Sequence, residues 1–291
     1  LLPHWTKGCI GSMEGLNFEA AGTTPYHFIT AAAMSKQSSN PVRELRYDDN
    51  NAGLGVRYLQ ELGVRYYMAF TAEAINQANM QAALVKVAQS GPWVIYKVEA
   101  SDLVVPMSVQ PVIVTSKVGD PKERWLEIGT SWFQHPEDWA AVPVASGPES
   151  WQKVEAIVDL NRRQGEPTDS SRRVDIVKPS ETINKVELPA VQVSNTVLED
   201  EAISFTVDKI GVPVLVRMSY FPNWKVENAE GPYRVAPNMM VVIPTSKEVR
   251  LHYGYSFIDF FAYFMTLLGV ATMAVRWRGR QVERNRKLLS R

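Results

Sequence analysis

One segment limits what this chain can fold into: the apolar run from Phe257 to Val275, FIDFFAYFMTLLGVATMAV, in which Asp259 is the sole charged residue. A helix of this length, rising ~1.5 Å per residue, covers the thickness of a bilayer's hydrocarbon layer. A buried core helix is the alternative, but such a helix rarely runs this far without polar residues and then meets a basic cluster. The sequence therefore predicts a transmembrane helix over residues 255–277.

The residues that flank this helix predict its orientation. Tyr255 and Trp277 stand at its two ends, where aromatic belts lie in membrane proteins. Arg276 and Arg278 begin a basic stretch that contains one acid, so the positive-inside rule places the tail, residues 278–291, in the cytoplasm. The bulk of the chain would then lie on the extracytoplasmic (periplasmic) side of the cell membrane.

Asp259 lies near the outer end of the predicted helix, within reach of the lipid headgroups. A charge inside a membrane segment either marks an ion path or has a structural role. Its position near the end favours a structural or capping role. The predicted membrane-interface residues are therefore Tyr255, Asp259, Arg276, Trp277 and Arg278.

The composition excludes several classes of protein. The 31 basic and 31 acidic residues balance, and because many basic residues follow the helix, the region before it is mildly acidic and a poor surface for nucleic acid. Cys9 is the only cysteine, so the chain forms no intramolecular disulfide. Asn-X-Ser/Thr sequons are absent as well. Both features suit a bacterial envelope protein.

The start of the chain suggests a longer parent. Leu1 stands first, and no apolar signal segment precedes the region predicted to lie outside the membrane. Such a region needs an upstream segment to carry it across. We therefore expect this chain to be the carboxyl-terminal part of a multi-spanning protein.

The first forty residues predict an ordered loop with short helical turns, because Gly, Thr, Ser and Ala dominate them. Glu14, Glu19 and His27 could form a polar constellation there, since a carboxylate near a histidine is the usual arrangement for acid–base chemistry. Their spacing matches no metal or triad signature. Polar loop residues that satisfy backbone groups are the favoured interpretation.

A strand–helix–strand unit is predicted next. The segment VRYYMAF has strand composition, TAEAINQANMQAALVKVAQ predicts a helix opened by Thr71, and WVIYKVE predicts a second strand. By the usual handedness of such units, the two strands should pair in parallel.

Three tryptophans recur at seven-residue spacing in the segment DPKERWLEIGTSWFQHPEDWA, which predicts a helix. This spacing places Trp125, Trp132 and Trp139 on one helix face. Such a face could stack on sugars, but a core or membrane-facing role is favoured.

The polar segment NRRQGEPTDSSRR, residues 161–173, predicts a solvated linker. Short β segments separated by turns follow it, which is typical of an antiparallel sandwich. The predicted fold class is therefore α+β. It comprises an α/β subdomain over 1–160, the linker, a β-sandwich over 174–254, the transmembrane helix over 255–277 and the cytoplasmic tail.

Catalytic signatures are absent from the sequence. It contains no G-x-x-x-x-G-K-[ST], G-x-S-x-G or H-E-x-x-H motif and no pair of cysteines, and its four histidines lie far apart. The sequence thus predicts no metal site, no cofactor and no catalytic residue in this chain.

Several segments carry a resemblance to a known group. The run ELGVRYYMAF, the later GPWVIYKV, and above all Tyr220 to Gly254 resemble the carboxyl-terminal part of YfhO-like and GT-C glycosyltransferase-like multi-spanning envelope proteins, especially actinobacterial ones. The resemblance covers most of the chain from about Tyr47 onward. It implies sugar transfer from a polyprenyl-phosphate donor to an envelope glycan or glycolipid on the outer membrane face. The catalytic acid of GT-C enzymes lies in an early loop that this chain does not contain.

Within the resembling segment, Trp224, Asn223, Tyr233 and Arg234 are the candidate glycan-binding residues, because aromatic faces stack on sugars while amides and guanidinium groups bind hydroxyls. The alternative is that Trp224 fills the sandwich core. Two other functions stay open: a non-catalytic membrane-anchored scaffold and a carbohydrate-binding module. The expected partners are the bilayer, an envelope glycan or polyprenyl-phosphate-linked sugar, and upstream transmembrane helices or other membrane proteins.

Overall fold

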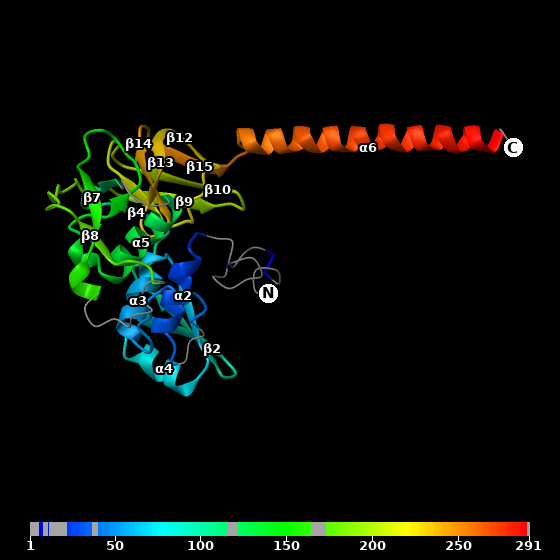
Figure 1. Cartoon of the computed structure of the whole chain (residues 1–291). Helices are drawn as coiled ribbons and strands as arrows, with labels where there is room; N and C mark the ends of the chain where they lie inside the picture. Colours follow the sequence, from blue (N-terminus) through cyan, green and yellow to red (C-terminus); the bar gives the residue numbers. More distant parts are fainter. Residues whose placement is uncertain are drawn as a thin grey trace.

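The computed structural model describes residues 6–7, 11, 22–36, 40–115, 121–163 and 173–289. Sheets and short helices form a folded body, and one long straight helix, α6, projects from it (Figure 1). This architecture confirms the predicted α+β class with a C-terminal apolar helix.

The helices, in chain order, are α2 (Thr24–Ala33), α3 (Ala52–Glu61), α4 (Ala72–Asn79), α5 (Pro121–Gln134) and α6 (Phe257–Leu289), with the 3₁₀ turns η2 (Pro136–Asp138) and η3 (Leu160–Arg163). The strands of the first half are β1 (Tyr66–Ala69), β2 (Leu84–Ser90), β3 (Trp93–Val98), β4 (Val104–Pro106), β5 (Val112–Thr115), β6 (Pro143–Val144) and β7 (Lys153–Val158). Those of the second half are β8 (Val177–Pro179), β9 (Val193–Leu198), β10 (Ala202–Val207), β11 (Val214–Val216), β12 (Trp224–Glu227), β13 (Ala229–Val235), β14 (Met239–Pro244) and β15 (Glu248–Tyr253).

The first sheet has three strands in the order β1-β3-β2, all antiparallel. The parallel strand–helix–strand prediction is therefore wrong. Thr71 does cap a helix, since its Oγ1 accepts a hydrogen bond from the Ala74 amide at 3.2 Å, but that helix ends at Asn79. The segment that follows is rich in β-branched residues and forms β2. The Gly91-Pro92 turn connects β2 to β3, and the two strands pair as a hairpin.

The largest sheet has eight strands in the order β4-β11-β14-β13-β6-β5-β7-β8, and only β5 makes parallel pairs, with β6 and β7. Strands from both sides of the predicted linker, residues 161–173, contribute to it. β7 and β8, which flank that segment, are antiparallel neighbours. The polar segment therefore connects two strands of one sheet, and its composition is that of any surface loop.

The predicted sandwich forms where the four-stranded sheet, β12-β15-β10-β9, packs on one half of the large sheet. Alternate residues of β10 and β15 point inward and meet Val214 and Val216 of β11 and Met240 and Val242 of β14. β4 from the first half of the chain also contributes Val104 to this core.

The other half of the large sheet packs against α5 and, beyond it, α2 and α3. The three tryptophans with heptad spacing, Trp125, Trp132 and Trp139, are all buried in this core, although Trp139 lies beyond the end of α5. The Phe133 ring of α5 stacks on Tyr58 of α3 at 4.3 Å between centroids. These aromatic side chains therefore join the helices to the sheet and do not form a sugar-binding or membrane-facing stripe.

Candidate membrane-interface site

The site begins with α6. The segment Phe257–Val282 is long and apolar enough to cross a membrane, and in the described part of the chain it is the one helix that meets this test. None of its most apolar window is buried against the body. At ~1.5 Å per residue, such a helix is longer than a ~30 Å hydrocarbon core. α6 continues without a break past Trp277, so Arg276, Trp277 and Arg278 are exposed on the same helix.

A polar junction joins α6 to the folded body. Only residues 254–256 separate β15 from α6. The Asp259 carboxylate accepts hydrogen bonds from the Ser256 backbone amide at 2.7 Å and from its hydroxyl at 2.6 Å. A carboxylate at this place satisfies free amides of the first turn and complements the helix dipole. The contacts of Asp259 are those of a capping residue.

Asn223 supplies the tertiary part of this junction. Its side-chain amide donates to the Asp259 carboxylate at 3.0 Å, and its backbone carbonyl accepts from the Gly254 amide at 3.0 Å. The side chain is buried, with 8% exposed, at the start of β12. Asn223 thus holds the chain on both sides of residues 255–256, instead of presenting its amide to a ligand.

Aromatic side chains surround the junction, and we call Phe221, Trp224, Tyr253 and Tyr255 the aromatic collar. The Phe221 and Tyr253 rings stack at 6.0 Å, and Trp224 meets Tyr253 edge-on at 5.7 Å. Tyr255 contacts Phe260 and Tyr263 of α6. Phe221 and Tyr253 are exposed, whereas Trp224 is half-buried against the sandwich core. Sequence reasoning missed Phe221 and Tyr253, because the fold alone brings Phe221, in the segment before β12, against Tyr253 at the end of β15.

The four predicted glycan-binding residues do not form one patch. Tyr233 and Arg234 are consecutive on β13 and therefore face opposite sides of the sheet. Tyr233 packs edge-on against Trp151, whereas Arg234 lies over the Trp125 ring at 4.8 Å and donates from Nε to Asn238 at 2.7 Å. Burial lowers the pKa of Arg234, with nearby Tyr26 opposing that shift.

The structure describes one of the three residues of the predicted polar constellation, His27. His27 lies on α2, where it is buried and packs near the Phe28 ring. Glu14 and Glu19 lie outside the described residues.

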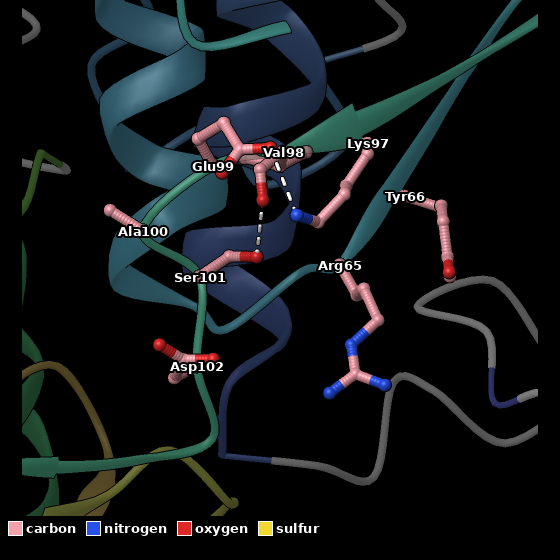
Figure 2. Close-up of a pocket in the computed structure, with 8 residues that line it drawn as sticks. All are labelled: Arg65, Tyr66, Lys97, Val98, Glu99, Ala100, Ser101 and Asp102. Carbon is pink, nitrogen blue, oxygen red and sulfur yellow. Dashed lines mark hydrogen bonds and ion pairs between the residues drawn. The ribbon is translucent and has the colours of Figure 1, made fainter. Parts of the chain in front are cut away.

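A pocket lies at one end of the three-stranded sheet (Figure 2). Its charged lining residues balance, with Arg65 and Lys97 against Glu99 and Asp102. Lys97 pairs with Glu99 at 3.0 Å, and the Ser101 hydroxyl donates to the Val98 carbonyl at 2.8 Å. The Ser101 hydroxyl therefore donates to the backbone and to neither carboxylate of the pocket, Glu99 or Asp102.

A second polar cluster surrounds Arg162, which contacts Asp138 at 3.0 Å and Asp159 at 3.6 Å. Lys178 of β8 also binds Asp159, at 3.1 Å. Burial would raise the pKa of Asp159, but the Lys178 hydrogen bond, the Asn161 amide and the two cations outweigh it and lower this pKa. These charges compensate one another and fasten the chain after β7 to β8 and to η2. Among the described residues, no group of three or more metal-ligating side chains is present.

The chain matches no family model, no curated protein and no solved structure. The aromatic collar and the α6 junction are therefore interpreted from their own geometry.

Proposed function

We propose that this chain is the extracytoplasmic module and membrane anchor of a multi-spanning envelope protein that serves the assembly of envelope glycans or glycolipids. The resemblance of Tyr220 to Gly254 to YfhO-like and GT-C proteins supports this proposal. The structural support is that this segment contains Phe221, Trp224 and Tyr253 of the aromatic collar and leads directly into α6.

The observation that carries the proposal is the exposed Phe221–Tyr253 pair beside the first turn of α6. Phe221 is 52% exposed and Tyr253 41%, and the two rings stack at 6.0 Å. If α6 spans the membrane, this pair lies at headgroup level, where the sugar of a polyprenyl-phosphate-linked donor or a glycolipid also lies. Aromatic faces stack on the apolar faces of sugars. Phe221 and Tyr253 thus replace the half-buried Trp224 as the expected sugar contacts.

The chain's own part in the reaction is positioning. Among the described residues, no group of three or more metal-ligating side chains occurs, and the hydroxyl–carboxylate pair of Ser256 and Asp259 caps α6. The charged residues that line the pocket of Figure 2 balance one another. The proposal assigns the chemical step to the part of the parent protein that GT-C enzymes place between their first spans. The collar would then hold the lipid-linked sugar or the acceptor against the bilayer surface.

The test uses the full chain in lipid nanodiscs and a radiolabelled polyprenyl-phosphate-linked sugar, with unglycosylated polyprenyl phosphate as the reference ligand. We expect retention of the sugar-linked lipid alone, and loss of that retention in Phe221→Ala and Tyr253→Ala. Ile210→Ala is the matched control, because Ile210 is equally exposed but lies in the turn after β10, at the opposite end of the sheet from Tyr253.

Equal retention of both lipids, or unchanged retention in the Tyr253 variant, would overturn the proposal. Binding of soluble glycans without any lipid dependence would favour the carbohydrate-binding module instead. The predicted sidedness is tested separately in intact cells that produce the Cys9→Ser chain. A cysteine introduced in the body at Ile157 should react with an impermeant maleimide, and one in the tail should not.

A further inference from the structure

The three-stranded sheet buries one face and exposes the other. Its inner face packs on α3 and α4 through side chains such as Ala69, Val94 and Tyr96. On the opposite face, the register pairs Met68 with Ile95, and Tyr66 with Lys97. We call this the outer sheet face, and its apolar members are Tyr66, Met68, Phe70, Val85, Trp93 and Ile95.

This face is unusually apolar for a solvent-exposed surface. Tyr66, Met68, Phe70, Val85 and Trp93 are each between 43% and 53% exposed. Antiparallel sheets with one solvated face normally alternate apolar residues inward with polar residues outward. A cluster of large apolar side chains on the outward positions therefore indicates a contact surface.

The distribution of residue types on the face matches a bilayer surface. The Phe70 and Trp93 rings contact each other at 5.0 Å beside the Gly91-Pro92 turn. At the other end of the face, Figure 2 shows Tyr66, Lys97 and Arg65 near one another. Tyrosine, tryptophan and long basic side chains are the residues that lie at the headgroup level, with their apolar parts toward the acyl chains.

The position of the sheet is the second observation. In Figure 1, β2 and its hairpin lie on the side of the body from which α6 leaves, whereas α3 and α4 lie on the far side of that sheet. Residues 254–256 are the whole connection between β15 and α6, and the Asn223–Asp259 hydrogen bond holds it. If α6 crosses a bilayer, the surface of that bilayer therefore lies on the side of the body to which the outer sheet face is turned.

We propose that the outer sheet face docks on the headgroup region of the bilayer that α6 crosses. The inference rests on the membrane anchoring in the proposed function and adds a second contact to it. A single helix can tilt in the bilayer and carry the attached body with it. A second contact removes that freedom and holds the aromatic collar in one orientation toward the lipid surface.

A second copy of the chain fits the face less well. Association of sheets through an edge needs a regular unpaired strand, but β2 has a register shift between Lys86 and Ala88 that disturbs its edge. The exposed Lys97–Glu99 ion pair also belongs to the face, and charged residues are depleted from the dry core of interfaces between protein copies.

The test places a fluorophore on the face of the full chain. Cys9→Ser removes the only cysteine, and NBD is then attached at Met68→Cys in nanodiscs that each hold one copy. Lipids with a nitroxide on the headgroup should quench this fluorophore. Ile157→Cys is the matched control, because Ile157 is apolar, 40% exposed and on β7, which lies on the side of the body opposite α6 in Figure 1. We expect no quenching there.

A third label separates the two proposals. NBD at Leu268→Cys, in the middle of α6, should be quenched by lipids that carry the nitroxide deep in the acyl chain. Loss of that signal would contradict the membrane anchor itself. If the Leu268 label is quenched while the Met68 label fluoresces as in water, docking of the outer sheet face is wrong and the anchor stands. Protection of the Met68 label only in nanodiscs loaded with two copies would assign the face to a second copy and also overturn the proposal.

Discussion

The side-chain amide of Asn223 donates a 3.0 Å hydrogen bond to the carboxylate of Asp259 and so links the folded body to the first turn of the apolar helix. The two residues are 36 positions apart, yet the same carboxylate oxygen also binds Ser256 immediately before the helix. This contact makes the direction in which α6 leaves the body a property of the fold, and not of a flexible tether.

Asn223→Ala should loosen the junction without unfolding the body. The substitution removes the amide that reaches Asp259, while the backbone carbonyl of Asn223 can still accept from Gly254. We expect faster chymotryptic cleavage after the exposed Tyr255 in the nanodisc-bound chain. Asn184→Ala is the control, because Asn184 is exposed and uses only its backbone amide in a hydrogen bond. Equal cleavage rates in the two variants would contradict the structural role of Asn223.

Asp159→Asn should lower the free energy of unfolding by about 2 kcal/mol at neutral pH, because it weakens charge-assisted hydrogen bonds around a buried side chain. The folded-state pKa of Asp159 lies below its ordinary value of 3.8. Its contribution is therefore present above that value and is lost as pH falls through the folded-state pKa. Urea titrations in detergent at pH 7 and near pH 3 measure this difference. The loss of unfolding free energy should be smaller near pH 3 than at pH 7. The control Asp200→Asn, at an exposed position, should show no such loss at either pH.

His135 should titrate below its ordinary pKa of 6.5. Burial lowers this pKa and nearby Arg162 adds to the shift, while Glu137 and Asp138 oppose it. Since the folded state favours the neutral ring, His135 stabilises the fold above pH 6.5 and loses that contribution as pH falls through its folded-state pKa. Carbon-13 NMR of labelled histidine measures the midpoint, which Glu137→Gln should move lower still. A midpoint at or above 6.5 would contradict the described environment.

Gly129→Ala should destabilise the body by about 2 kcal/mol through overpacking. A Cβ on Gly129 would meet the Pro237 carbonyl oxygen at 2.8 Å and collide with the Tyr26 hydroxyl, where α2 crosses α5. Gly53→Ala is the matched helical control, because its nearest neighbour would be 3.7 Å away. The control should be neutral or stabilising by up to about 1 kcal/mol, as expected for alanine in a helix. Unfolding followed by tryptophan fluorescence compares them, and equal midpoints would refute the close α2–α5 contact.

The local patterns of the sequence predicted several elements and misassigned others. Thr71 marked a true helix start, but the segment from Leu84 to Ser90 forms a strand where the periodicity predicted continued helix. Helix and strand are nearly balanced in such a segment, and pairing with β3 decides the outcome. The composition of the polar stretch at 161–173 predicted a linker, but it held no sign that the strands before and after it, β7 and β8, pair in one sheet.

The candidate site was visible in part. Tyr255, Asp259, Arg276, Trp277 and Arg278 were predicted as membrane-interface residues from their place beside the apolar run, and the structure places them at the start of α6 or along it. Tyr233 and Arg234 were grouped with Trp224 from their nearness in sequence, although strand alternation turns them to opposite sides of β13.

The sequence by itself determined that this chain contains a long apolar helix with an acidic start and a basic end. Length, apolarity and flanking charge are properties of one continuous segment, and they act on lipid without help from the rest of the chain. Only the tertiary structure decided that Asn223 holds Asp259, that Phe221 stacks on Tyr253, and that one sheet joins both halves of the chain. Those contacts depend on which distant strands pair and in what register. Backbone hydrogen bonds form in the same way between any two strands, so the local sequence does not specify the partner strand.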